Sequence, residues 1–289
     1  MPLPPLAEQH RIVAKIDALF SELDKGVEML ETIRQQLMMY RQAVLGWAFE
    51  EVITEEIQRK RVVELCSQIV DCQHSTPKWT EGGKLCLRTT NFREGYLDLS
   101  EKNYVSNETY NERIRRLKPE ENDVLYSREG AILGIACLVP RDFELCLGQR
   151  MMLMRPSDLI LPQFLMYYLN SPHIEAIVKK MTGGTASPHI NIRDIKQFSI
   201  PLPNLSKQAE IVTYIESCMS IYDKLEQILS GSMSKAQALK QSILKKAFAG
   251  ELVPQDPSDE PAERLLERIK AEQKKETAKP KPARRKKNA

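Results

Sequence analysis

The sequence predicts an α+β protein in which one mixed α/β domain is flanked by two long helices that form an antiparallel coiled coil. Three observations predict this class: a repeated segment of about fifty residues, a coiled-coil periodicity in both copies, and short strands and helices between them. The expected divisions are 1–54 for the first long helix, 55–200 for the mixed domain, 201–252 for the second long helix, 253–273 for a short amphipathic helix and 274–289 for a disordered basic tail.

The repeat is clearest where the two copies begin. Residues 2–13 read PLPPLAEQHRIV, residues 201–212 read PLPNLSKQAEIV, and the alignment continues without a gap to residues 49 and 248. Roughly fifteen of about fifty aligned positions are identical, too many for a chance match of composition. Each copy opens with proline-rich, extended chain and then becomes helical, so helices are expected to begin near Ala7 and Ser206.

Apolar residues in both copies recur in alternating steps of four and three, which is typical of a coiled-coil seam. In the first copy they are Ile12, Ile16, Leu19, Leu23, Gly26, Leu30, Ile33, Leu37, Tyr40, Val44 and Trp47. In the second copy they are Ile211, Ile215, Cys218, Tyr222, Leu225, Leu229, Ser232, Ala236, Leu239, Ile243 and Lys246. A helix over residues 7–50 would be roughly 65 Å long, and a seam this narrow must pair with another helix. Two unrelated core helices would explain the periodicity but not the shared Pro-Leu-Pro opening.

The region between the helices begins with a charged connector at residues 51–61 and then alternates strands, turns and short helices. Strands are expected at 86–92, 124–127, 132–139, 145–154 and 197–200. Helices are expected at 162–169 and 172–181, with Ser171 as the N-cap of the second and Pro172 in its first turn. A long polar loop, residues 182–191, follows.

Composition limits the class of protein without naming a partner. The chain has 289 residues, of which 42% are hydrophobic and 28% charged, and no apolar run approaches the roughly 18 to 20 residues of a membrane span. Since the N-terminus also lacks a signal pattern, we expect a cytoplasmic protein. The net charge is +3, but residues 274–289 carry +7 and residues 1–273 therefore carry −4. The basic tail is either a solubilising end or a non-specific phosphate contact.

Motifs for catalysis are missing from the sequence. There is no phosphate-binding G-x-x-x-x-G-K-[ST] loop, and the four histidines lack metal-ligand spacing. The six cysteines are scattered among apolar neighbours and form no C-x-x-C pair, so reduced and partly buried thiols are expected rather than zinc or disulfides. The chain is therefore predicted to bind rather than to catalyse.

Polar loops at the expected strand ends carry the side chains that pair with base edges or hold phosphate oxygens. The candidate DNA-binding residues are Arg88, Thr89, Thr90, Asn91, Ser127, Arg128, Gln149, Arg150, Thr185, Ser187, His189 and Asn191. Taken singly, each is better explained as part of a solvated loop, and only their occurrence together in one domain on a rigid spacer indicates a binding surface. Arg113, Arg115 and Arg116 form a basic run that either holds phosphates or pairs with Glu112, Glu120 or Glu121.

These features together resemble one family. The Pro-Leu-Pro-x-Leu-x-x-Gln-x-x-Ile-Val opening, the helix that ends in Ala-Phe, and residues 249–256 (AGELVPQD) resemble the conserved regions of the DNA-specificity subunit of type I restriction-modification enzymes. The mixed domain looks like one of that family's target recognition domains. Family members usually alternate two such domains with two helices, whereas this chain reads helix, domain, helix, so it resembles a half-length form.

The resemblance implies a non-catalytic subunit that reads half of a bipartite site in double-stranded DNA and docks methyltransferase subunits. It also implies a motor-nuclease (restriction) subunit, and a second half-specificity chain or a copy of itself, as further partners, and no membrane. No cofactor is expected in this chain; S-adenosylmethionine, ATP and Mg belong to the partner subunits. Two other classes stay open: a coiled-coil scaffold whose mixed domain binds protein, which the acidic balance of residues 1–273 permits, and a stand-alone nuclease or methyltransferase.

Overall fold

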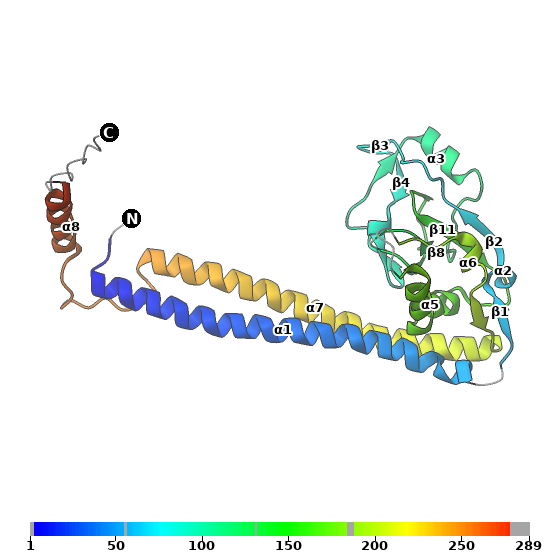
Figure 1. Ribbon diagram of the computed structural model, residues 1–289, viewed down its shortest axis with the longest axis horizontal. Helices are drawn as coiled ribbons and strands as arrows, with labels where there is room; N and C mark the ends of the chain where they lie inside the picture. Colours follow the sequence, from blue (N-terminus) through cyan, green and yellow to red (C-terminus); the bar gives the residue numbers. More distant parts are fainter. Residues whose placement is uncertain (1–2, 55–56, 131, 184–187, 278–289) are drawn as a thin grey trace, which may run out of the picture. The chain divides into compact units, whose positions relative to one another are not determined.

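The computed structural model describes residues 3–54, 57–130, 132–183 and 188–277, and the chain divides into two compact units. Unit 1 comprises Met1–Gln36 and Lys224–Ala289, and unit 2 comprises Leu37–Asp223. Two long helices, α1 (Leu6–Thr54) and α7 (Leu205–Ala249), contribute residues to both units (Figure 1). No helix among the described ranges is both long enough and apolar enough to cross a membrane.

The repeated motif has a local structural role, because its glutamine ties the proline-rich entry to the first turn of each helix. In the first copy Gln9 Nε2 donates to the Pro4 carbonyl at 2.8 Å, and in the second copy Gln208 Nε2 donates to the Pro203 carbonyl at 2.9 Å. Asn204 also caps α7, since its Oδ1 accepts the Lys207 amide at 2.9 Å. Both helices begin within a residue of the predicted positions.

Unit 1 contains antiparallel segments of the two long helices. Arg34 pairs with Glu226 at 2.7 Å, and Asp24 pairs with Lys240, whose Nζ also lies 5.7 Å from the Phe20 ring centroid. Higher numbers on one helix therefore meet lower numbers on the other. The seam residues on α1 from Ile12 to Leu30 are half-buried, apart from the exposed Gly26.

The short C-terminal helix of unit 1, α8 (Ala262–Thr277), follows a segment that Asp259 holds to Arg11 at 2.6 Å. Residues 274–277 were predicted to begin the disordered tail, but they continue this helix. Residues 278–289 of the predicted tail lie outside the described part of the chain.

Unit 2 contains the mixed domain, built on two four-stranded sheets. One has the order β2 (Cys66–Asp71), β11 (Met151–Pro156), β8 (Val124–Ser127), β9 (Ala136–Leu138), and all its pairs are antiparallel. The other has the order β10 (Leu145–Leu147), β4 (Lys84–Leu87), β7 (Tyr104–Val105), β3 (Trp79–Thr80), with β10 and β4 parallel. Two-stranded pairs join β5 (Phe92–Arg93) to β6 (Tyr96–Leu97) and β1 (Arg59–Arg61) to β12 (Ser199–Pro201).

Short helices complete the domain. They are α2 (Val62–Leu65), the 3₁₀ turn η1 (Thr89–Asn91), α3 (Asn107–Ile114), α4 (Pro162–Leu169), α5 (Pro172–Thr182) and α6 (Ile192–Ile195). The predicted α4 and β8 match residue for residue. Ser171 does stand at the N-cap of α5, but its side chain makes no capping bond and its hydroxyl is buried without a partner among the described residues.

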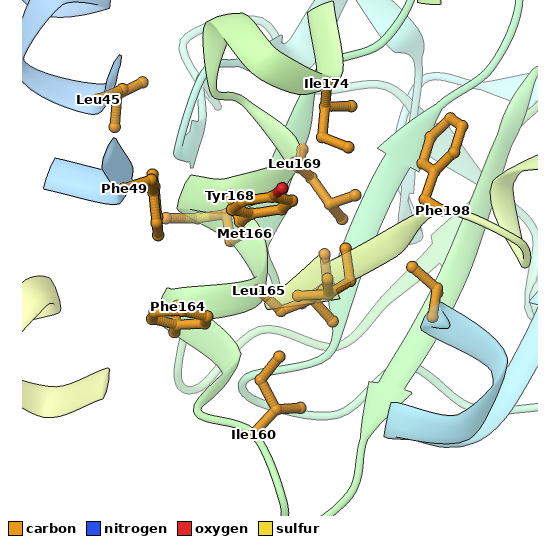
Figure 2. Close-up of a cluster of buried hydrophobic side chains, with 14 of the residues drawn as sticks. Leu45, Phe49, Ile160, Phe164, Leu165, Met166, Tyr168, Leu169, Ile174 and Phe198 are labelled. Carbon is orange, nitrogen blue, oxygen red and sulfur yellow. The ribbon is translucent and has the colours of Figure 1, made fainter. Parts of the chain in front are cut away.

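The last turns of α1 are buried in the core of the domain rather than in a simple seam. Phe49 is 0% exposed and meets Phe164 and Tyr168 edge to face, with ring centroids 5.4 and 5.1 Å away (Figure 2). The seam prediction fails here, because Trp47 is 63% exposed while Leu45 and Phe49 are fully buried. The face that a helix buries shifts once its neighbour is a domain as well as another helix.

The charged connector was predicted too long at both ends. The helix α1 continues to Thr54, and residues 59–61 form β1, whose Arg59 lies opposite Pro201 of β12. This pairing brings the entry to the mixed domain beside its exit.

All six cysteines are free, and five of them are buried, as the scattered pattern predicted. Burial raises the pKa of the sixth, Cys66, to about 12, so its thiol is kept protonated at neutral pH.

Replacing Phe49 by Ala is expected to lower the free energy of unfolding by about 3–5 kcal/mol, because it removes a buried ring and leaves a cavity between α1 and α4. Phe248 holds the equivalent position in the second copy and is 61% exposed, so Phe248→Ala is the matched control and should change stability by less than about 0.5 kcal/mol. Urea unfolding followed by circular dichroism measures both. Equal losses in the two variants would contradict the core assigned to Phe49.

Candidate nucleic-acid interface

The candidate loops lie together because the strands that carry them end at the same side of the two sheets, which we call their edge. Leu147 of β10 lies beside Leu87 of the parallel β4, so the residues after both strands leave at the same edge. Met151 of β11 lies opposite Ser127 of β8, so the residues before β11 and after β8 also meet. The turn from Gly148 to Arg150 belongs to both groups and joins them.

Backbone hydrogen bonds tie the loops together at this edge. The Gly148 amide donates to the Leu87 carbonyl at 2.9 Å, and a Cβ on Gly148 would lie 2.2 Å from that oxygen, so only glycine permits the approach. The Arg128 amide donates to the Arg150 carbonyl at 2.9 Å, and the Ile190 amide donates to the Arg128 carbonyl at 2.9 Å.

The fourth loop joins through an antiparallel bridge between Glu129 and His189 and through the Gly130 amide, which donates to the Pro188 carbonyl at 3.2 Å. We call residues 88–91, 127–130, 148–150 and 188–191 the rim loops. Four segments that are far apart in the sequence are thus brought together mainly by main-chain contacts, which leave side chains available for other contacts.

The side chains of the rim loops fall into two groups. Exposed candidates are Arg88, Thr90, Arg150, His189 and Asn191, and half-buried candidates are Thr89 and Gln149. Buried candidates are Asn91, Ser127 and Arg128. Thr185 and Ser187 lie outside the described residues. The exposed group has the chemistry to reach a ligand, whereas the buried group is already bonded within the domain.

Arg150 is the most prominent of the exposed group. Its side chain is 59% exposed, and its nearest carboxylate, Glu129, is 4.0 Å from Nε. Its backbone has φ 66°, an uncommon conformation for a residue other than glycine. The neighbouring backbone bonds hold this conformation, so the fold fixes the direction in which the Cα–Cβ bond of Arg150 leaves the rim.

Asn91 and Ser127 hold the ends of the rim loops in place. Asn91 Oδ1 accepts the Arg88 amide at 2.9 Å, and its Nδ2 donates to the carbonyls of Asp98 and Glu101 at 3.0 and 2.9 Å. Ser127 Oγ donates to the Ile135 carbonyl at 3.3 Å and accepts the Ile135 amide at 3.0 Å. Their expected role as DNA ligands stays a prediction without support from this geometry, since both side chains are buried and bonded within the domain.

Arg128 anchors a segment that the sequence did not single out. Its Nε and Nη2 donate to the two oxygens of Asp71 at 3.1 and 3.2 Å, and its Nη1 lies 3.0 Å from Glu129. His74 Nε2 in turn lies 3.0 Å from Asp71. A polar loop residue has the same sequence signature whether it binds a partner or a neighbouring carboxylate, so the Asp71 and His74 contacts could not be anticipated.

Arg113 is buried and does not belong to a phosphate-binding run. It donates to the carbonyls of Leu147 and Gly148 at 3.0 and 2.9 Å and to that of Ser75 at 2.6 Å, and thereby supports the turn that carries Arg150. Two of the three carboxylates predicted to pair with the basic run bind other residues instead: Glu120 meets Arg155 at 3.2 Å and Glu121 meets Arg141 at 3.5 Å.

Within the described residues, no group of three or more His, Cys, Asp or Glu side chains is arranged to hold a metal ion. The rim loops therefore present hydrogen-bonding and cationic groups to a ligand, and no metal-dependent chemistry is assigned to them.

Residues 82–230 match a family model described as "Type I restriction modification DNA specificity domain". The chain is 30% identical over 305 residues to the Type I restriction enzyme EcoBI specificity subunit of Escherichia coli, with 94% of this chain and 64% of that protein covered. It is 29% identical over 302 residues to the EcoKI specificity subunit of Escherichia coli strain K12, with 94% and 63% covered. The chain thus spans slightly less than two thirds of the length of these relatives.

One solved structure shares the fold, with a TM-score of 0.63 and 24% sequence identity over 87% of this chain and 62% of that one. It is described as "Structural basis underlying complex assembly and conformational transition of the type I R-M system".

Arg128→Ala is expected to lower the free energy of unfolding by about 3–5 kcal/mol, because it leaves Asp71 partly buried without its cation. Arg150→Ala is the matched control: its side chain is exposed, so the change in stability should stay within about 0.5 kcal/mol. Thermal and urea unfolding measure both variants. If Arg128→Ala unfolds at the same urea concentration as the wild type, the ion pair does not support the fold.

Proposed function

Because the chain belongs to the family of type I restriction modification DNA specificity domains, we propose that it binds double-stranded DNA sequence-specifically through the rim loops and carries out no catalysis itself. The observation that supports this most directly is the convergence of the four loops on one edge, with Arg150 and His189 exposed there. One recognition domain of this kind reads one part of a split target.

The exposed side chains suit direct reading of base edges in the major groove. An arginine can donate two hydrogen bonds to guanine O6 and N7, and an asparagine can bond both groups that adenine presents. Arg150 is the first candidate for such a contact, since its backbone conformation is fixed and its one ion pair among the described residues, with Glu129, is at the distance limit. Asn191 is exposed on the neighbouring loop, although its Nδ2 lies 3.4 Å from Asp194 Oδ2. Gln149 is anchored to the His74 carbonyl and positions the turn.

The long helices supply the spacing and the docking surfaces in this proposal. The antiparallel contacts within unit 1 support a coiled coil that holds recognition elements at a set distance. Methyltransferase subunits dock on the chain and use S-adenosylmethionine, and a motor-nuclease subunit uses ATP and Mg to cleave. The other part of a split target is read by a second recognition domain.

The test is a selection from random duplexes by the full chain in complex with methyltransferase subunits, followed by a gel shift with the selected sequence. Enrichment of one sequence and selective retardation are expected. A domain that binds only another protein would retard neither selected nor random DNA at low salt. A stand-alone enzyme would methylate or cleave DNA when supplied with S-adenosylmethionine or Mg²⁺ and no partner subunit.

Arg150→Ala should weaken binding to the selected duplex by about tenfold or more, which is the loss of roughly 1–3 kcal/mol expected for one bidentate base contact. It should also relax the preference for a base at one position. Fluorescence anisotropy with duplexes that vary one base pair at a time measures both effects. The control is Arg141→Ala. Arg141 is exposed and pairs with Glu121, which precedes β8, so it lies near the start of β8, whereas the rim loops lie at the end of β8. A uniform loss over all duplexes would assign Arg150 to a phosphate instead.

A further inference from the structure

A cation stacked on an aromatic ring adjoins the rim loops. The guanidinium carbon of Arg88 lies 5.4 Å from the centroid of the Trp79 ring, within the range of a cation–π contact. Trp79 is 38% exposed, and its strand β3 is the outer strand of the sheet β10-β4-β7-β3 (Figure 1). A large aromatic side chain thus remains in contact with solvent on an edge strand, next to an exposed arginine.

The positions of both side chains are set by the backbone. Trp79 and Lys84 both lie opposite Val105 of β7, on either side of it, so the short chain between β3 and β4 must turn to cross from one side of β7 to the other. Gly83 makes this turn with φ +130°, and a Cβ there would lie 2.4 Å from the Val105 carbonyl oxygen. The backbone of Arg88 is held on both sides. Its own amide donates to Asn91 Oδ1, and the carbonyl of the preceding Leu87 accepts the Gly148 amide. The backbone of Arg88 is therefore held beside the turn that carries Arg150, while its guanidinium lies over the Trp79 ring.

The charge of Arg88 is not balanced by a carboxylate. No ion pair of Arg88 is found among the described residues, whereas Arg128 binds Asp71 and Glu129 and Lys84 binds Glu144. Lys78, next to Trp79, is exposed and likewise forms no ion pair within the described ranges. An exposed cation with an apolar ring below it suits a partner that alternates negative charge with flat or apolar surface, which describes the phosphates and deoxyriboses of DNA.

We propose that Trp79 and Arg88 form a clamp on the DNA backbone, in which Arg88 donates to a phosphate and the Trp79 ring packs on the adjacent deoxyribose. This inference rests on the proposed function and assigns different contacts within it to different residues. The clamp fixes the register of the duplex independently of sequence, while Arg150 reads a base edge. Trp79 was absent from the sequence-based candidates because an isolated tryptophan has no recognisable spacing.

The clamp is tested by anisotropy with two duplexes, the selected target and a scrambled one of equal length, on the full chain in complex with methyltransferase subunits. Trp79→Ala and Arg88→Ala should each weaken binding about tenfold to both duplexes, so that the ratio of the two affinities stays unchanged. Arg88→Ala should also reduce the slope of log K against log salt by about one, because one phosphate contact is lost. Trp79→Phe should keep most of the affinity, since it retains a ring.

The matched control is Phe143→Ala, because Phe143 is 41% exposed, similar to Trp79, and among the described residues no cation lies over its ring. It should leave both affinities unchanged. If Trp79→Ala lowers the melting temperature, Arg88→Ala still tests the clamp, because it leaves β3 intact.

Three results would overturn the clamp. The first is unchanged affinities in Trp79→Ala and Arg88→Ala. The second is a changed ratio of the affinities for the target and scrambled duplexes, which would mean that the pair contacts bases. The third is an unchanged salt slope in Arg88→Ala. Each leaves the proposed function standing as long as the wild type selects its target. A wild type that binds neither duplex refutes the proposed function itself, and the clamp with it.

Discussion

The burial of the last turns of α1 is the interaction on which unit 2 depends. Phe49 is enclosed by Phe164 and Tyr168, and the same core reaches β8 and β11 through Tyr126, Met152 and Met154. A helix whose side chains complete the core of a domain cannot rotate about its axis without opening that core. The sheets, and the loops at their edge, are therefore fixed to this part of the helix rather than merely tethered to it.

The rim loops illustrate a division between main chain and side chain. Their assembly uses backbone amides and carbonyls, and the side chains that are consumed, such as Asn91 and Arg113, bind backbone groups in turn. The exposed side chains contribute little to holding the loops together. Substitutions at exposed positions can therefore alter what the rim contacts while the loops keep their places, which suits the binding role proposed for them.

The sequence predicted the features that are encoded locally. The long helices start just after their Pro-Leu-Pro openings, α4 starts at Pro162, and β8 occupies the short apolar run 124–127. Features that depend on distant partners were not predictable. The strand β1 exists because of β12, about 140 residues further on, and Phe49 is buried where its repeat equivalent Phe248 is not. For the same reason, loop composition could identify the rim but could not separate Arg128, which has a hidden carboxylate, from Arg150, which does not.

The left-handed backbone at Arg150 restricts how this site can evolve. With φ 66°, the position accepts glycine, asparagine or aspartate readily and unbranched side chains at a modest cost, but valine, isoleucine and threonine would clash with their own backbone. The backbone conformation thus limits which substitutions are tolerated at this position, whatever the ligand. Apart from glycine, the residues that this backbone accepts best are polar, so the fold itself favours variants that still form hydrogen bonds.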